Sequence, residues 1–206
     1  NQRQIFKILC SGNSNFLHHA AIFSKSKKVL EILWEKIEKL FEEFTMDPKK
    51  LKNFLLMKGK LEKNALMWSI SSQNENSFYF LFEEVYCKIF TIKDFAFETA
   101  ENNDVSESLL HYLARWGSLP MLEFALEKIK KEFSHEELRN FIKLKNEMGE
   151  NVLHLAAMQN LNEKSIEFLV NFIENEEVTR MLSELSLSKH TPLHVAVQKN
   201  NLKVCE

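Results

Sequence analysis

Histidine is the side chain of this sequence best suited to chemistry, because imidazole can bind a metal or exchange a proton near neutral pH. Four of the seven histidines, His18, His111, His154 and His194, directly follow a leucine. Each of the four belongs to a different part of the sequence, far from the next. Metal ligands lie only about 2 Å from a zinc ion, and side chains that recur with a structural repeat usually serve the repeat. We therefore predict a structural role for these four histidines and no metal site.

The remaining patterns do not favour an enzyme. The sequence has no glycine-rich phosphate loop, no serine nucleophile motif and no zinc-protease motif. Acidic pairs such as Glu136-Glu137 lie in lysine-rich segments, where a solvated helix face is the simpler interpretation than a catalytic dyad. We expect no catalytic residue and no cofactor.

Composition and charge narrow the class further. Four glycines and three prolines are too few for the turns of a many-stranded sandwich or barrel, so an all-α protein is expected. A formal net charge of −2 with interleaved signs argues against nucleic acid as a partner. Three widely separated cysteines indicate reduced thiols and an intracellular, cytoplasmic protein. No apolar run approaches the ~20 residues that span a bilayer, so direct membrane insertion is not expected.

The segments around the histidines recur five times. Residues 191–196 read Thr-Pro-Leu-His-Val-Ala, and related segments start near residues 15, 64, 108 and 151. The leucines of these motifs are Leu17, Leu66, Leu110, Leu153 and Leu193, and the interval between them shortens steadily along the chain. The segment at 191–196 matches the Thr-Pro-Leu-His-x-Ala signature of ankyrin repeats, and the sequence resembles that family, although its repeats exceed the usual length of about 33 residues.

The additional length predicts a third, short helix in each repeat. Ahead of the later motif leucines, apolar side chains stand three positions apart, as on one face of a helix, at Leu51 and Phe54, Leu138 and Phe141, and Val178 and Met181. Helix starts are indicated by Asp47 before Pro48, by the capping pair Ser134 and Glu137, and by Asn175. A longer second helix is expected at about residues 28–44, 77–90, 119–133 and 163–172.

These patterns predict one ankyrin-type helical-repeat solenoid over residues 1–206, with repeats of about 40–49 residues. The apolar pair Ile5 and Phe6 falls where Phe141 and Ile142 precede Leu153, which indicates the end of a short helix from a preceding repeat, and 202–206 matches the start of a second helix. Neither end resembles a capping repeat, so we expect a fragment of a longer chain at both ends.

The resemblance to ankyrin repeats implies roles for particular residues. In that family the motif histidine lies near the start of the first helix and hydrogen-bonds the adjoining turn, so the turn served by Met67 is expected to be less tightly bonded. Partners of such proteins commonly bind the concave face, which is made of loop tips and the ends of first helices. The partner-binding candidates carried over in this way are Phe23, Arg115, Trp116, Glu147, Met148, Glu150, Met158, Gln159 and Lys199.

Two questions remain open from the sequence. Phe23, Trp116 and Met158 either form an exposed apolar stripe or tuck under the additional short helix. The function is either that of a scaffold that binds a protein partner, or that of a structural or regulatory segment of a larger channel, effector or enzyme whose active domain lies elsewhere.

Overall fold

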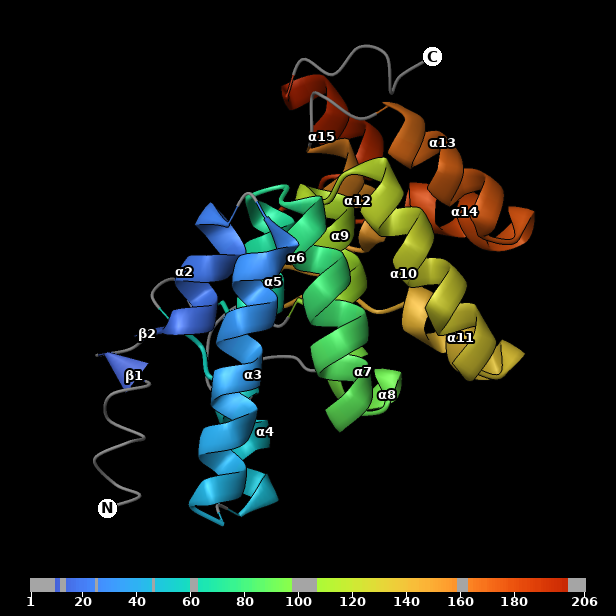
Figure 1. The fold of residues 1–206 in the computed structure, drawn as a ribbon. Coiled ribbons are helices and arrows are strands. Elements are labelled where there is room, and N and C mark those ends of the chain that lie inside the picture. Colours follow the sequence, from blue (N-terminus) through green and yellow to red (C-terminus); the bar gives the residue numbers. More distant parts are fainter. Residues whose placement is uncertain are drawn as a thin grey trace. The chain divides into compact units, whose positions relative to one another are not determined.

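The computed structural model describes residues 10–11, 14–24, 26–45, 47–59, 63–97, 107–158 and 163–199. The chain divides into two compact units, Asn1–Thr91 and Ile92–Glu206, called here the N-terminal unit and the C-terminal unit. Helices make up almost all of the regular structure (Figure 1), which confirms the all-α repeat fold. The described residues also contain two short antiparallel strands, β1 (Cys10–Ser11) and β2 (Ser14–Asn15).

The first repeat of the N-terminal unit has the three expected helices, α2 (Phe16–Phe23), α3 (Lys27–Glu43) and α4 (Pro48–Leu56). Helix α3 buries four side chains at helical spacing: Leu30, Trp34, Ile37 and Phe41. The Asp47 side chain accepts a hydrogen bond from the Lys49 backbone N–H at 2.9 Å, so the predicted start of α4 is confirmed.

The second repeat departs from regular α-helix. Its first helix is α5 (Ala65–Ser71), and its second consists of α6 (Glu75–Tyr79), a π-helical segment η2 (Phe80–Tyr86) and α7 (Cys87–Ile89) in succession. The π-helical turn is wider than an α-helical turn, and the consecutive side chains Phe80, Leu81 and Phe82 are all buried in it. Apolar spacing alone predicted one continuous helix here.

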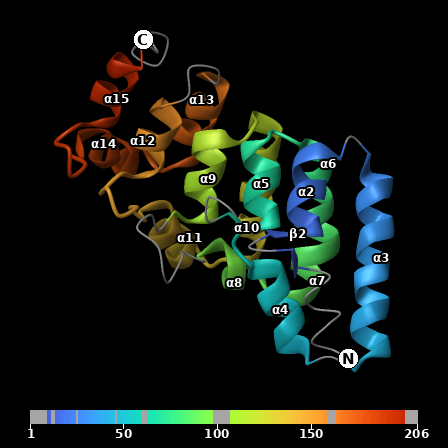
Figure 2. The same cartoon turned by 90° about the vertical axis from the view of Figure 1, so that its left-hand side faces the viewer.

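The C-terminal unit continues the pattern (Figures 1 and 2). Among the first helices of the repeats, α12 lies between α9 and α15 and contacts both. The second helices α10 and α13 pack against each other. Helices α8 and α14 pack against the first helix that follows them, which is α9 or α15. The bounds are α8 (Ile92–Ala96), α9 (Leu109–Trp116), α10 (Leu119–Glu132), α11 (His135–Ile142), α12 (Val152–Ala157), α13 (Glu163–Phe172), α14 (Asn175–Ser183) and α15 (Pro192–Gln198).

Of the other two predicted helix starts, one was right and one was wrong. Ser134 and Glu137 form the expected capping box at α11. Asn175 is already the first helical residue of α14, and Glu174 occupies the capping position without a side-chain hydrogen bond to the helix. The Glu174 carboxylate pairs instead with His135, at 3.0 Å, which takes it away from the helix end.

Candidate functional site

Each motif histidine belongs to the cap of a first helix. In α2, the Asn15 side chain accepts a hydrogen bond from the His18 backbone N–H at 3.2 Å, and the Asn15 backbone N–H donates to His18 Nδ1 at 3.0 Å. Ser108 with His111, and Asn151 with His154, repeat this reciprocal arrangement. The histidine takes the place that glutamate or glutamine occupies in an ordinary capping box.

The other ring nitrogen of three of these histidines reaches the loop before the next repeat. His18 Nε2 lies 2.9 Å from the Met57 carbonyl oxygen, and His111 Nε2 lies 3.1 Å from that of Leu144. His154 Nε2 lies 3.0 Å from the carbonyl oxygen of His190. Because Nδ1 accepts from the cap N–H, the ring proton belongs on Nε2, which donates to the carbonyl. The three rings therefore join one repeat to the next.

Burial keeps these rings neutral. Desolvation lowers the pKa of His111 to about 4 and lowers the pKa of His18 and His154 below the ordinary value. His194 is exposed, and its Nδ1 accepts from the Thr191 backbone N–H at 3.3 Å. Among the residues that the structure describes, no group of three or more histidine, cysteine or acidic side chains is placed to hold a metal ion. The loop that Met67 would serve falls within residues 98–106, outside the described residues.

Two loop tips of the C-terminal unit share the same backbone hydrogen-bond pattern. In the fourth repeat the Asn146 N–H donates to the Glu150 carbonyl at 2.9 Å, and in the fifth the Ser186 N–H donates to the His190 carbonyl at 2.9 Å. The two tips are joined directly, because the Leu187 N–H donates to the Met148 carbonyl at 2.8 Å. Met148 is 46% exposed and Leu187 is 72% exposed. We call these two side chains the tip pair.

Arg115 lies in an ion-pair network at the end of α9. Its guanidinium is 2.8 Å from the carboxylate of Glu107, which is almost fully buried, and 3.5 Å from the carboxylate of Glu150. Glu150 also accepts a hydrogen bond from the Asn146 side-chain amide at 2.8 Å. Arg115 therefore connects the last turn of α9 to the loop tip of the fourth repeat. Its guanidinium, which the sequence suggested would bind a partner, is already paired with two carboxylates of this chain.

The apolar candidates differ in exposure. Phe23 is 73% exposed at the end of α2, and Trp116 is 39% exposed at the end of α9. Met158 is partly buried and packs against Ala157 and the α15 core residues. Phe23 belongs to the N-terminal unit and the other two to the C-terminal unit, so each is described within its own unit.

Gly117 caps the C-terminal end of α9, although its backbone is not in the left-handed region. Its φ is −74°, in extended backbone, and its N–H donates to the Leu113 carbonyl at 2.9 Å. A Cβ added at this position would lie 2.7 Å from that same carbonyl oxygen. The close approach of residue 117 to the Leu113 backbone, in the last turn of the same helix, therefore requires the glycine.

The other predicted binding residues are placed as follows. Glu147 and Lys199 are exposed, while Gln159 lies outside the described residues. The structure thus brings Met148 together with Leu187, and Arg115 together with Glu150, within the C-terminal unit.

The sequence analysis missed a set of contacts between successive third helices. Glu177 of α14 is 5% exposed and pairs with Lys143 and Arg139 of the preceding repeat. In the register of the motif leucines its equivalents are Asp94 and Glu137, and Glu137 pairs with Lys93 of the repeat before it. An acidic residue stands at this position ahead of the last three motif leucines, whereas Lys50 stands there ahead of Leu66. This recurrence was the signal that could have indicated these contacts.

Comparison with known proteins agrees with this geometry. The family described as ankyrin repeats (3 copies) matches residues 110–206, so this part of the chain consists of ankyrin repeats. The matched residues cover the motifs near 108, 151 and 191, whereas the segments near 15 and 64 lie outside the match. No curated protein matches the chain. No helix among the described residues is long and apolar enough to cross a membrane.

Proposed function

We propose that this chain is a protein-binding module and that the tip pair, Met148 and Leu187, lies at the centre of its binding surface. Ankyrin repeats in general mediate protein–protein interactions. The observation that carries the proposal is the exposure of two large apolar side chains, at 46% and 72%, on tips whose backbones are hydrogen-bonded to each other. Rigid loops lose little conformational entropy on binding, and methionine is enriched in interfaces.

The end of α9 extends this surface in the proposal. Trp116, 39% exposed, follows Arg115 in sequence, and Arg115 is tied to Glu150 at the end of the same tip. Tryptophan is among the residue types that most often dominate binding energy. Arg115 acts in this arrangement as a positioning residue, because its guanidinium is already engaged by two carboxylates.

Affinity capture from a lysate, followed by titration of the purified partner, tests the proposal. The double variant Met148→Ser, Leu187→Ser should weaken binding by at least about tenfold, since apolar anchors at the centre of an interface each contribute on the order of 1–2 kcal/mol. Leu182→Ser is the matched control, because Leu182 is a similarly exposed apolar residue on α14, at 44%. Equal binding by the double variant and the wild type would rule out the tip pair as the binding surface.

We also propose that the chain acts without catalysis and inside the cell. The second proposal is supported by the odd number of three cysteines, which are far apart in the sequence. Turnover by the purified chain in broad hydrolase and transferase screens would contradict the first proposal. Recovery of the tagged protein from the medium rather than from the cell would contradict the second.

A further inference from the structure

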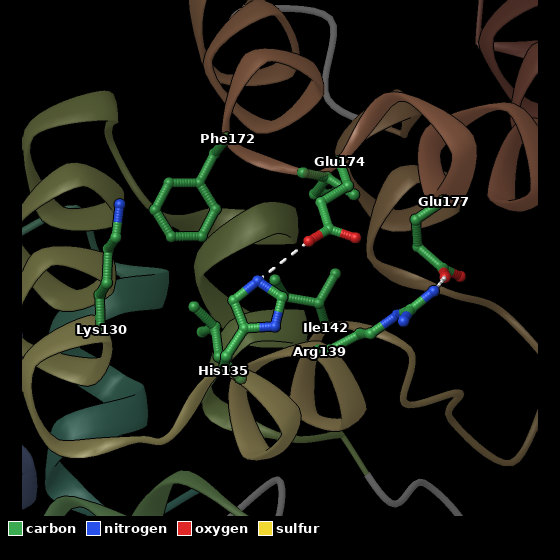
Figure 3. Close-up of a pocket in the computed structure, with 9 residues that line it drawn as sticks. Lys130, His135, Arg139, Ile142, Phe172, Glu174 and Glu177 are labelled. Carbon is green, nitrogen blue, oxygen red and sulfur yellow. Dashed lines mark ion pairs between the residues drawn. The ribbon is translucent and has the colours of Figure 1, made fainter.

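A pocket of about 160 Å³ lies in the C-terminal unit, between the second and third helices of two successive repeats (Figure 3). Residues from α10 and α11 form one side, and residues from α13, α14 and the turn between them form the other. Its apolar lining consists of Leu138, Ile142, Phe172 and Ile173. The third helix, which an ankyrin repeat of ordinary length lacks, supplies a wall of this pocket, so the pocket belongs to the lengthened repeat.

The two carboxylates at the rim of the pocket, Glu174 and Glu177, both have cationic partners close by. Glu174 is paired with His135 at 3.0 Å, and these two side chains point toward each other in Figure 3. Glu177 is held by Lys143 at 2.9 Å and Arg180 at 2.5 Å, both closer than the 3.7 Å to Arg139 on the pocket side.

Lys130 is the rim cation without a carboxylate partner in the described part of the chain. Its Nζ lies 5.7 Å from the centre of the Phe172 ring, as a cation–π contact. Arg139 adds a second cation that its carboxylate partner holds only at 3.7 Å. The rim therefore offers positive charge beside an apolar lining, which favours an occupant that combines an apolar group with an anion.

The size of the pocket indicates one side chain. An apolar cavity of about 150 Å³ is large enough to hold a benzene molecule. The pocket, at about 160 Å³, matches a single aromatic ring in volume.

One repeat earlier, three aromatic rings pack together around the residue equivalent to Ile173. Phe97 stacks on Phe133 with ring centres 5.5 Å apart and meets the edge of Phe141 at 5.0 Å. In the register of the motif leucines, Ile173 is equivalent to Phe133, and Asn140 is equivalent to Phe97. The exposed Asn140 carries no ring, so this repeat has no counterpart of the Phe97 ring.

We propose that this pocket binds an aromatic side chain of an acidic segment in a partner protein. The ring contacts Ile142, Phe172 and Ile173, and a carboxylate next to it in the partner pairs with Lys130. The site is formed by second and third helices, not by the loop tips, and it stands independently of the tip pair.

Titration with short synthetic peptides tests this assignment on the whole 206-residue chain. Peptides with Asp-Phe-Asp, Asp-Ala-Asp and Lys-Phe-Lys at the centre separate the contribution of the ring from that of the charge. The expected result is binding of Asp-Phe-Asp, at least about tenfold tighter than the other two. The methyl signals of Ile142 and Ile173 should show ring-current shifts, while the signal of Ile129, which does not line the pocket, stays unchanged.

Two variants connect the binding to the pocket. Lys130→Glu should weaken Asp-Phe-Asp about tenfold, whereas Lys131→Glu, an exposed neighbour outside the pocket, should not. Leu138→Phe fills the pocket from within and should abolish the methyl shifts without unfolding the chain, because Leu138 is only half buried. Equal binding of Asp-Phe-Asp and Asp-Ala-Asp, or binding unchanged by both pocket variants, would overturn the proposal. Loss of binding in the tip-pair variant alone would also overturn it, since the peptide would then bind at the loop tips.

Discussion

The ammonium group of Lys143 lies 2.9 Å from the carboxylate of Glu177 in the next repeat, although Glu177 is only 5% exposed. A carboxylate this deeply placed keeps its charge only if cations compensate for the lost water. Burial by itself raises the pKa of Glu177, but the hydrogen bond from Lys143 and the charges of Arg180, Lys143 and Arg139 outweigh it, and the net pKa is lowered. The pair connects the loop after α11 to α14, so it stabilises the stacking of the third helices.

Glu177→Gln should therefore lower the free energy of unfolding by about 1–2 kcal/mol, which is less than the ~3–5 kcal/mol of a fully buried pair because the cations are partly exposed. Glu176→Gln changes an exposed neighbour on the same helix and should stay within about 0.5 kcal/mol of the wild type. Urea denaturation of both variants measures the difference. A loss of the same size in both would show that the Glu177 pairs contribute nothing specific.

Acid titration should reveal the same carboxylate. The folded pKa of Glu177 is lowered, so its contribution to stability is present above the unfolded value of about 4.3 and is lost as pH falls through the folded pKa. Below about pH 4.3, unfolding free energy should fall less steeply with pH in Glu177→Gln than in the wild type. Parallel curves for the two proteins would contradict the lowered pKa.

His111 predicts a second pH dependence, at higher pH. Its folded pKa is about 4, while an unfolded histidine has a pKa of about 6.5. The unfolded chain therefore binds a proton between these values that the folded chain does not, and stability should fall as pH decreases from about 6.5 to 4, by at most about 1.4 kcal/mol per pH unit for this ring.

His111→Gln should make that slope shallower. It should also cost about 1–3 kcal/mol at about pH 7.5, because a glutamine that caps Ser108 cannot also donate to the Leu144 carbonyl, as the Nε2 of His111 does. Unfolding of both proteins at a series of pH values provides the measurement. His135→Gln, the same replacement at an exposed histidine, serves as the control for the substitution.

Replacing Arg115 should mainly affect the stability of the fold, whereas replacing Trp116 should mainly affect partner binding. Arg115→Ala leaves Glu107, which is 3% exposed, without its cation and should lower the unfolding free energy by about 1–3 kcal/mol. Trp116→Ala should cost about 1 kcal/mol or less because the ring is 39% exposed, and should weaken partner binding. Thermal melting and partner titration of the two single variants give both numbers. A stable Arg115→Ala protein that has lost its partner would reverse these roles.

The two loop tips allow a matched test of backbone strain. Gly149 has φ of +69° and its equivalent, Lys189, has φ of +59°, both in the left-handed region. Gly149→Ala should destabilise by about 1–2 kcal/mol, because a Cβ there is strained and lies 3.2 Å from the Leu187 nitrogen.

Lys189→Gly should increase stability, by up to about 1 kcal/mol, since glycine adopts this conformation without the Cβ penalty. Chemical denaturation of the two single variants shows whether their effects have opposite signs, as expected. Effects of the same sign would mean that the tips are held by side-chain contacts and not by backbone conformation.

The sequence by itself determined the repeat, its unusual length and the positions of nearly all helices. This succeeded because helix caps and apolar spacing are local: Asp47, Ser134 and the histidine caps act on their immediate neighbours in the chain. Local signals failed in two places. Apolar spacing does not distinguish the π-helical turn at Phe80–Tyr86 from α-helix, and the Glu174 carboxylate at the start of α14 pairs with His135 of the preceding repeat.

Tertiary structure alone decided which residues are available for binding. Arg115 and Glu150 look like free surface charges in the sequence, and folding pairs them across two repeats. Leu187 comes to lie beside Met148 only through a backbone hydrogen bond between the tips of two successive repeats. The pocket beside Lys130 likewise exists only where four helices meet. Exposure and pairing depend on contacts between residues distant in sequence, and a periodic pattern does not encode which of its exposed positions a neighbouring repeat will cover.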